Sequence, residues 1–482
     1  EGTDTTDFRK RKTILGDIVG SNMWYLGAPS SALRLPGYGT FAASGVVAGR
    51  SPMIYVGAND GMIHGFSAAQ SAEHLGKEQF AYVPLGAYAN LTKLTKQSYT
   101  HTNMVDGSPF SGDVLVSTSP TTWKTYLAGF MGSGGKGYFI LDVTNPSTSV
   151  FSESNAGNLV ILDSTLTTNP DIGYMFTQPS KDPSNPTHAV QFTMMNNNRP
   201  ALILGNGVNS TNERPVLLVQ YLDGQKEVFP LIASAATGQT NGLMNPQVID
   251  LNSDGKADIV YAGDLQGNLW KFDITATTES GWTVSFGGNP LFMARDSGNS
   301  PQPIVAAPIW VPHPNGGIML GFTTGRNFTT GDRTDVSEQS IYAIWDNSKI
   351  TIASSGAVAV IDDASKRITN GRISLVQQTA NSTVVSSFGG RTFYSSSSNP
   401  VNYASTGANP NKRGWYMNFL DSGERGTNNP EMSNAGGNYA DFFSSIPAQG
   451  TDSNTETCSL TSKAEVPFVT TLSLINGAPT AK

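Results

Sequence analysis

Oxygen-bearing side chains recur at close spacing in the segment Asp-Leu-Asn-Ser-Asp-Gly-Lys-Ala-Asp, residues 250–258. They occupy positions 1, 3, 5 and 9 of the segment: Asp250, Asn252, Asp254 and Asp258. Gly255 stands at position 6, where a loop that wraps a hard cation needs a sharp turn. Because calcium binds through oxygen ligands at this spacing, the segment predicts a Ca²⁺ loop.

The loop differs from calcium loops that lie between two helices in how the ligand set is completed. In those loops position 7 supplies a backbone carbonyl and position 12 a bidentate Glu. Here Lys256 would supply the carbonyl, but position 12 is Tyr261, so Asp258 has to complete the set. The flanking segments are β-branched runs without helical periodicity. We therefore expect the loop to join two β-strands.

Two other interpretations of this segment remain open. Asp, Asn, Ser and Gly also fill ordinary turns, because their side chains and backbones suit local hydrogen bonding. Three carboxylates within nine residues would repel one another in an empty turn, however, and a divalent ion removes that cost. Magnesium is the other candidate ion, although it usually keeps its waters and rarely uses a cage made only of protein ligands.

The composition favours an all-β fold and argues against several functions. Charged residues make up 14% of the 482 residues, whereas Gly (51) and Pro (27) are plentiful, which suits many short strands and turns. A net charge of −7 and the lack of a long basic run argue against nucleic-acid binding. No apolar run approaches a membrane span. A single cysteine, Cys458, leaves no disulfide within these residues, and the first residues suggest a domain excised from a longer protein.

A repeated pattern indicates the architecture. An apolar strand that ends in Gly, a turn and an alternating strand occur in 54–67 and again in 260–273, and the two align without a gap. Looser copies lie at 127–142, 203–223 and 320–346, and weaker ones at 415–421 and 469–476. Seven copies of this kind are typical of β-propeller blades. We expect the alternating apolar residues Tyr261, Leu269, Trp270 and Phe272 to pack between blades.

The expected domain organisation follows from these copies. Residues 1–14 are expected to form an N-terminal tail and residues 15–482 a single β-propeller domain. Within it, segment 422–465 is expected to be poorly ordered or divergent. Long polar inter-strand loops are expected at 181–187, 289–303, 329–338 and 395–412.

No catalytic set emerges from the sequence. The five histidines, at positions 64, 74, 101, 188 and 313, lack metal-ligand spacing. His101 with Asp106 resembles a base and its orienting group, but no nucleophile motif accompanies them. The Gly-rich segment 132–137 lacks the phosphate-loop spacing and precedes a strand, so it predicts a hairpin turn. We expect a protein that is not an enzyme.

Further motifs run in order along the chain: Leu15-Gly-Asp-Ile-Val, Tyr55-Val-Gly-Ala-Asn-Asp-Gly-Met, Ala81-Tyr-Val-Pro, Tyr99-Thr-His, Val105-Asp-Gly, Gly134-Gly-Lys-Gly-Tyr, Leu141-Asp-Val-Thr, Gly205-Asn-Gly, residues 258–273, Arg413-Gly-Trp-Tyr and Gly423-Glu-Arg. With them the chain resembles the C-terminal domain of the PilY/PilC family of type IV pilus biogenesis and tip-associated proteins. The resemblance implies a modified seven-bladed β-propeller with long inter-strand loops. It also places Ca²⁺ on Asp250, Asn252, Asp254, the Lys256 carbonyl and Asp258. The family's Cys- and Gly-rich ending is only faintly similar to residues after about 430.

The resemblance implies an exported, non-enzymatic protein at the cell surface, on the pilus tip or outer membrane. Its expected role is calcium-regulated pilus biogenesis, in which it promotes assembly, counteracts retraction and supports tip adhesion and twitching motility. The expected partners are minor pilins of the pilus tip complex and a host-cell receptor. Two alternatives stay open: a propeller enzyme similar to quinone-dependent dehydrogenases, and a plain adhesin that calcium makes rigid.

Overall fold

The structure is made up of antiparallel β-sheets that follow one another along the chain. It is a computed structural model, and it describes residues 7–11, 13–29, 33–70, 75–182, 185–388, 391–448 and 464–480. The first sheet has the order β1 (Trp24–Leu26), β2 (Met53–Ala58), β3 (Met62–Ser67) and β4 (Glu78–Tyr82). The second has the order β5 (Phe110–Thr118), β6 (Thr121–Phe130), β7 (Tyr138–Asp142) and β8 (Val160–Asp163). The third has the order β11 (Phe192–Met194), β12 (Pro200–Gly205), β13 (Val216–Tyr221) and β14 (Val228–Ile232).

The remaining sheets vary this plan. In the fourth, β15 (Leu243–Ile249), β16 (Ile259–Asp264), β17 (Asn268–Asp273) and β18 (Thr283–Val284) are joined by β19 (Phe292–Met293), which pairs with β17. The fifth has the order β20 (Ile309–Pro312), β21 (Ile318–Thr323), β22 (Ser340–Asp346), β28 (Gly414–Asn418) and β25 (Val376–Gln378), with β25 parallel to β28. A sixth, three-stranded sheet contains β29 (Glu431–Met432), β30 (Tyr439–Ile446) and β31 (Val466–Ser473).

Short elements fill the connections. Three hairpins form sheets of their own: β9 (Lys181–Asp182) with β10 (Asn185–Ala189), β23 (Ile350–Ile352) with β24 (Val358–Val360), and β26 (Ala380–Phe388) with β27 (Arg391–Ser396). The α-helices are single turns: α1 (Tyr38–Ala42), α2 (Gly45–Ala48), α3 (Tyr88–Leu91), α4 (Ala156–Leu159) and α5 (Ser285–Gly288). The 3₁₀ turns are η1 (Leu85–Ala87), η2 (Thr92–Thr95), η3 (Gly132–Gly134), η4 (Glu153–Asn155), η5 (Glu279–Gly281), η6 (Thr330–Thr334), η7 (Ala364–Lys366) and η8 (Gly371–Ser374).

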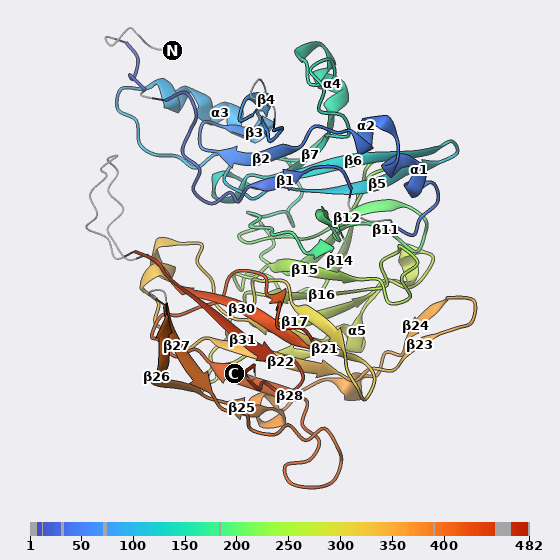
Figure 1. The fold of residues 1–482 in the computed structure, drawn as a ribbon, viewed down its shortest axis with the longest axis vertical. Coiled ribbons are helices and arrows are strands. Elements are labelled where there is room, and N and C mark those ends of the chain that lie inside the picture. Colours follow the sequence, from blue (N-terminus) through green and yellow to red (C-terminus); the bar gives the residue numbers. More distant parts are fainter. Residues whose placement is uncertain are drawn as a thin grey trace.

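The sheets pack face to face in chain order, from the first at the top of Figure 1 to the fifth near the bottom. Strand β16 shows how alternation produces this packing, because successive side chains point to opposite faces. Its Val260 lies in the apolar core shared with the third sheet, whereas Tyr261 lies in the core shared with the fifth. Leu269, Trp270 and Phe272 of β17 are buried in these same two cores. The predicted packing between blades is confirmed.

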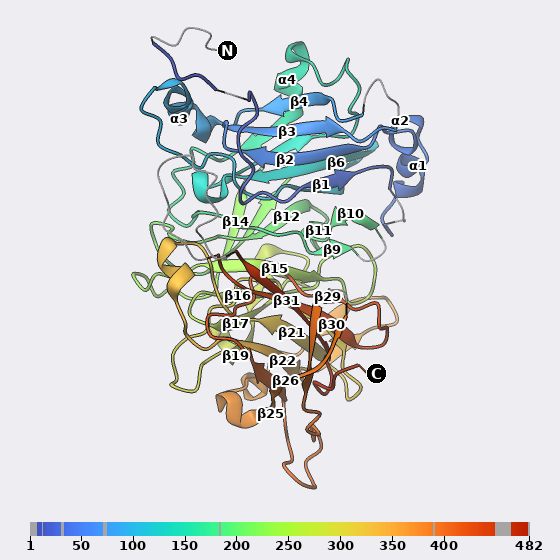
Figure 2. The same cartoon turned by 60° about the vertical axis from the view of Figure 1, so that its left-hand side comes forward.

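The first strands of successive sheets surround a common cavity of about 1030 Å³. Strands β5, β11, β15 and β20 contribute to its lining, and β29 of the sixth sheet completes part of the wall. In Figure 2, β11, β15 and β29 lie one below another in the middle of the molecule. A shared central space bordered by the first strands of neighbouring sheets is the arrangement of a β-propeller.

The repeat copies match the sheets unevenly. The five copies between residues 54 and 346 are the second and third strands of the first five sheets, as predicted. The copy at 415–421 is not a separate blade, because its strand β28 is the fourth strand of the fifth sheet, displaced along the sequence by the insertion 347–413. The copy at 469–476 is part of β31 in the three-stranded sheet. The described residues thus give five sheets of four or five strands and one of three, and the expected count of seven is not confirmed.

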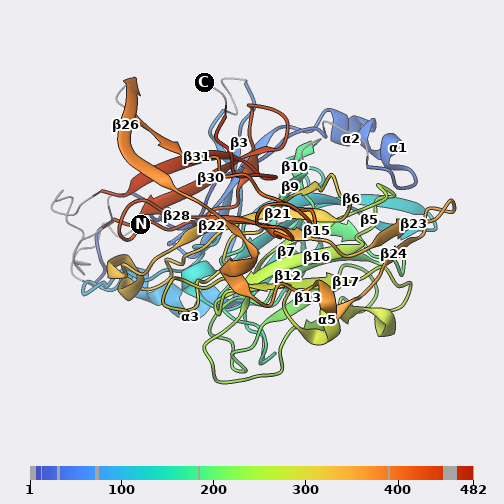
Figure 3. The same ribbon diagram turned by 90° about the horizontal axis from the view of Figure 1, so that it is seen from below.

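Several segments expected to be irregular contain regular structure; segment 289–303, for example, includes β19 of the fourth sheet. Within segment 181–187, expected as a loop, residues 181–182 and 185–187 lie in strands β9 and β10, because Asn185 pairs with Asp182 and Ala189 with Lys181. Segment 422–465 contains β29 and β30, whereas its residues 449–463, with Cys458, lie outside the described residues. Hairpin β26–β27 stands out from the body in Figure 3.

Candidate calcium site

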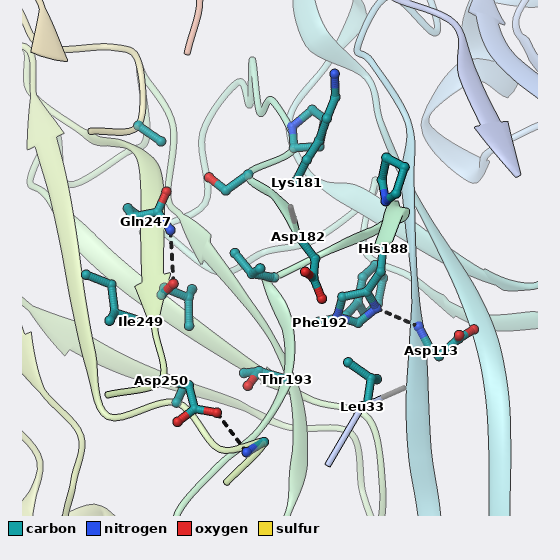
Figure 4. A pocket seen from close by; sticks show the side chains of 18 of the residues that line it. Leu33, Asp113, Lys181, Asp182, His188, Phe192, Thr193, Gln247, Ile249 and Asp250 are labelled. Carbon is teal, nitrogen blue, oxygen red and sulfur yellow. Dashed lines mark hydrogen bonds between the residues drawn. The ribbon is translucent and has the colours of Figure 1, made fainter. Parts of the chain in front are cut away.

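Segment 250–258 connects β15 to β16 in the fourth sheet, so the prediction of a strand-to-strand loop is confirmed. Asp258 N donates to Ile249 O at 2.9 Å and closes the neck of the loop. Figure 4 shows Asp250 directly after Ile249, at one end of the central cavity. The β-ladder therefore holds both ends of the loop while its middle turns away from the sheet.

Gly255 is required at position 6 by both conformation and space. Its φ of +89° lies in the left-handed region, where a side chain is strained. A Cβ at this position would lie 2.7 Å from Leu35 Cγ, which is too close for a carbon contact. Leu35 comes from the segment before α1, so this glycine allows a distant part of the chain to lie against the loop.

Backbone amides within the loop hold its polar side chains in place. Asp250 accepts hydrogen bonds from the amides of Gly255 at 2.7 Å and Asp254 at 3.2 Å. Asn252 Oδ1 accepts from Asp254 N at 3.0 Å, and Asp254 Oδ1 accepts from Lys256 N at 3.0 Å. These bonds fold three of the predicted ligand side chains back over their own backbone.

Asp258, the last predicted side-chain ligand, is buried at the base of the loop. Its Oδ2 accepts from Leu251 N at 2.7 Å. Burial raises the pKa of Asp258 to about 6, and the negative charges of Asp250 and Asp254 add to the rise. The pKa of Asp250 is also raised, by burial first and then by the charge of Asp254. The three carboxylates are therefore close enough to repel one another, and a divalent cation between them would remove that repulsion.

The Lys256 carbonyl is oriented by its own peptide group. The next amide, Ala257 N, donates to Met194 O at the end of β11, at 2.9 Å. In a trans peptide the N–H and the C=O point in opposite directions, so the Lys256 oxygen points away from β11. The Lys256 side chain is held separately, because its Nζ donates to Asn198 Oδ1 at 2.8 Å.

The chemistry of this donor set fits calcium. All five predicted donors are oxygen atoms, and they include two carboxylates whose pKa values are raised by burial and by their negatively charged neighbours. Across the described ranges, no group of three or more His, Cys, Asp or Glu side chains is assembled as a metal site. The predicted set relies instead on an amide oxygen and a backbone carbonyl in addition to carboxylates. Calcium binding at this loop stays a prediction.

Several residues that support the loop could not be identified from the sequence. Asn196 Nδ2 donates to Ala257 O at 2.8 Å, and Asn252 Nδ2 donates to Gly356 O at 2.8 Å. The two residues of each pair are separated by 61 and 104 positions along the chain, respectively. The one local signal was the run of three Asn residues at 196–198, which forms the turn between β11 and β12.

The other motifs singled out in the sequence do not assemble a reaction centre. His101 pairs with Asp17 at 2.7 Å, whereas Asp106 accepts a hydrogen bond from Gly20 N. His101 and Asp106 are therefore not paired with each other. Segment 132–137 joins β6 to β7, as predicted for a hairpin connection. His188 is buried and accepts a hydrogen bond from the amide of Asp113. His74 lies outside the described residues.

His64 forms a buried charged cluster in the first sheet. Its Nδ1 lies 2.5 Å from Glu78 Oε1, and its Nε2 lies 3.1 Å from Asp60 Oδ1. Burial lowers the pKa of His64, but the hydrogen bonds and charges of Asp60 and Glu78 outweigh burial and raise it overall. A raised pKa means that protonation stabilises the fold below about pH 6.5 and that this stabilisation is lost as the pH rises through the folded-state value.

We therefore expect His64→Gln to reduce the free energy of unfolding by about 1 kcal/mol or more at pH 5.5, and by less at pH 8.5. Urea unfolding of both proteins at the two pH values measures the difference. His101→Gln is the matched control, because His101 is also paired with an Asp but is 42% exposed. A His64→Gln effect of equal size at both pH values would contradict the assignment.

The chain is similar to known proteins along most of its length. The family model of the PilY1 beta-propeller domain matches residues 15–389. The type IV pilus biogenesis factor PilY1 of Pseudomonas aeruginosa (strain PAO1) is 36% identical over 454 residues, which cover 87% of this chain and 35% of the relative. A type IV pilus biogenesis factor PilY1 homolog of Xylella fastidiosa (strain Temecula1) is 31% identical, over 87% of this chain and 27% of the relative.

A solved structure agrees with the sequence relatives. The crystal structure of the Pseudomonas aeruginosa PilY1 C-terminal domain aligns with a TM-score of 0.71 and 30% identity, covering 94% of this chain and 86% of that one. The chain spans about a third of the length of the curated relatives it matches. Within the described residues, no helix is both long and apolar enough to cross a bilayer. The extent of the family match shows that this chain belongs to the PilY/PilC family and carries its PilY1 beta-propeller domain.

Proposed function

We propose that this chain is the calcium-regulated propeller of a type IV pilus biogenesis factor, that it acts at the cell surface and pilus tip, and that it is not an enzyme. The observation that carries the proposal is the 36% identity over 87% of the chain to a protein named for pilus biogenesis. The names of the matched relatives describe biogenesis factors and no enzymatic activity. They favour this function over that of a quinone-dependent propeller enzyme.

The proposed role of calcium follows from the loop geometry. Without the ion, three neighbouring carboxylates repel one another, two of them in surroundings that raise their pKa values. Calcium bound by Asp250, Asn252, Asp254, the Lys256 carbonyl and Asp258 would stabilise one conformation of the loop. Because position 12 lacks the bidentate Glu, we expect a dissociation constant of roughly 10⁻⁶ to 10⁻⁴ M. At 100 times that concentration the ion adds about 2.7 kcal/mol to the stability of the bound form.

The proposed partners are minor pilins of the pilus tip complex. We expect the surface around loop 250–258 to bind them more tightly when calcium orders the loop than when the loop is empty. The test is capture of detergent-solubilised pilus subunits by the immobilised chain, in millimolar calcium and in chelator. We expect capture in calcium and at least a five-fold loss in chelator, since allosteric couplings are commonly of this size or larger. Absence of capture under both conditions would contradict the proposed function.

Capture that is equal with and without calcium would instead favour a protein that calcium only makes rigid. Tip adhesion, twitching motility and the counteraction of retraction belong to the same proposal, as does a host-cell receptor. Shear assays for surface pili and assays of binding to host cells separate these roles. When calcium binding is lost, a pure adhesin would lose host binding but keep normal piliation.

A further inference from the structure

The tip of hairpin β23–β24 lies against the predicted calcium loop. Asn252 Nδ2 donates to Gly356 O at 2.8 Å, which joins the loop of the fourth sheet to a turn 104 residues later. The hairpin belongs to the insertion between β22 and β28 of the fifth sheet, and it extends from the side of the molecule in Figure 1. The contact therefore connects the loop to an element outside its own sheet.

This hydrogen bond determines which end of the Asn252 side chain faces the loop. The amide carries a nitrogen, which donates, and an oxygen, which accepts. With Nδ2 bound to Gly356 O, the opposite end, Oδ1, lies 3.0 Å from Asp254 N inside the loop. Calcium binds the oxygen and not the nitrogen of such an amide. The Gly356 carbonyl is thus a positioning group for a predicted ligand.

The hairpin has little other support at its tip. Its base is anchored, because Ile350 and Val360 pack against the core between the fourth and fifth sheets. Further out, Ile352 is 51% exposed, and β23 and β24 pair only with each other among the described strands. Two-stranded hairpins are marginally stable in water, so a small free energy shifts the equilibrium between a closed and an open tip.

The opposite side of the loop is held more firmly. There the turn at 196–198 donates through Asn196 Nδ2 to Ala257 O, and Asn198 Oδ1 accepts from Lys256 Nζ. That turn connects two strands of the third sheet, and Met194 at its start is buried. Of the two contacts, the one to the hairpin is therefore the one whose partner can move.

We propose that calcium binding to loop 250–258 and closure of the β23–β24 tip on that loop are thermodynamically linked, so that this hairpin transmits calcium occupancy to the protein surface. The inference rests on the calcium site of the proposed function and adds its regulated element. Linkage is reciprocal: the factor by which calcium raises the equilibrium constant for tip closure equals the factor by which tip closure raises the calcium affinity. Both directions can be measured.

The first measurement is hydrogen exchange of residues 350–360 in chelator and in saturating calcium. The reporters are the amides of Gly356, which donates to Ala353 O at 2.9 Å, and Ala353, which donates to Ala357 O at 2.9 Å. We expect calcium to slow their exchange by about five-fold or more. Unchanged exchange in a protein that binds calcium by calorimetry would overturn the linkage and leave the calcium site intact.

The second measurement compares the calcium affinities of Gly356→Val and Gly316→Val. Gly356 has a φ of +88° and Gly316 a φ of +84°; a Cβ at either position would have no heavy atom within 4 Å, and each amide donates to the residue three before it. A β-branched side chain strains both turns equally, but only Gly356 touches the loop. We expect Gly356→Val to weaken calcium binding about five-fold and Gly316→Val to leave it unchanged.

Equal losses of affinity in the two variants would mean that general destabilisation, and not tip closure, sets the effect, and would overturn the proposal. Wild-type affinity in Gly356→Val would overturn it as well. If the unaltered chain binds no calcium, the calcium site itself fails, and the calorimetry distinguishes that result from a failure of the linkage alone.

Discussion

Replacing Lys271 with methionine is expected to lower the free energy of unfolding by about 3–5 kcal/mol, because it leaves a buried carboxylate without its cation. Lys271 Nζ lies 2.7 Å from Asp346 Oδ2, and both side chains are only 1% exposed. This pair joins β17 of the fourth sheet to the end of β22 in the fifth. Tyr261 also donates to Asp346 Oδ2, at 2.6 Å, so the cluster joins the fourth sheet, which carries the predicted calcium loop, to the fifth.

The electrostatics of Asp346 support the direction of this effect. Burial raises its pKa, but the charge and hydrogen bond of Lys271, with hydrogen bonds from Ser348 and Tyr261, hold the pKa below its ordinary value. The carboxylate therefore stays charged in the folded protein, and its stabilisation is lost as the pH falls through that lowered pKa.

Urea unfolding of Lys271→Met and of the control Lys124→Met tests the prediction. Lys124 forms a similar pair with Asp142 at 2.9 Å, but its side chain is 40% exposed. An exposed pair contributes about 1 kcal/mol or less, so the control should be near wild type. A Lys271→Met protein as stable as the control would show that the buried pair does not hold the two sheets together.

The second large effect is expected at the loop. Asp254→Ala should weaken calcium binding by roughly 100-fold or more, because it removes a charged ligand from a site without a bidentate Glu. Asp254 is exposed, and its hydrogen bonds stay within the loop, so the fold should persist. Calorimetry gives the affinity and circular dichroism the fold.

Asp363→Ala is the matched control for this substitution. The Asp363 side chain is 44% exposed and also accepts a hydrogen bond from the amide two residues later, that of Ser365 at 2.9 Å. We expect this variant to bind calcium as the unaltered chain does. Wild-type affinity in Asp254→Ala would remove that residue from the ligand set, and equal losses in both variants would show a non-specific effect.

Local patterns in the sequence were sufficient for the repeating part of the fold. The period-two alternation around Tyr261 and Trp270 identified the strands and also their burial between sheets, because each strand sends alternate side chains to two neighbours. The positions of Gly255 and of the strands on either side identified the loop and its attachment to the sheet. These features depend only on neighbours along the chain.

Long-range pairing could not be predicted in the same way. Strand β28 resembles the start of a new repeat, yet it pairs with β22 across the insertion 347–413. Nothing local to Asn252 indicates Gly356, and nothing local to Gly255 indicates Leu35. Such partners are set by how the sheets pack, which a single sequence does not encode as a pattern.

The predicted calcium site joins these two kinds of information. Its predicted ligands follow from spacing along nine residues, whereas its proposed regulation depends on partners from elsewhere in the chain: Leu35, the turn at 196–198 and the tip of β23–β24. An ion that orders this junction would change a surface formed by separate parts of the propeller. This is the route by which we propose that calcium regulates the binding of a pilus subunit.

Calorimetric titration of the chain with calcium tests the central claim most directly. The loop geometry predicts one ion per chain with a dissociation constant of roughly 10⁻⁶ to 10⁻⁴ M, and little competition from an equal concentration of magnesium. Absence of binding at millimolar calcium, or equal affinity for magnesium, would contradict it.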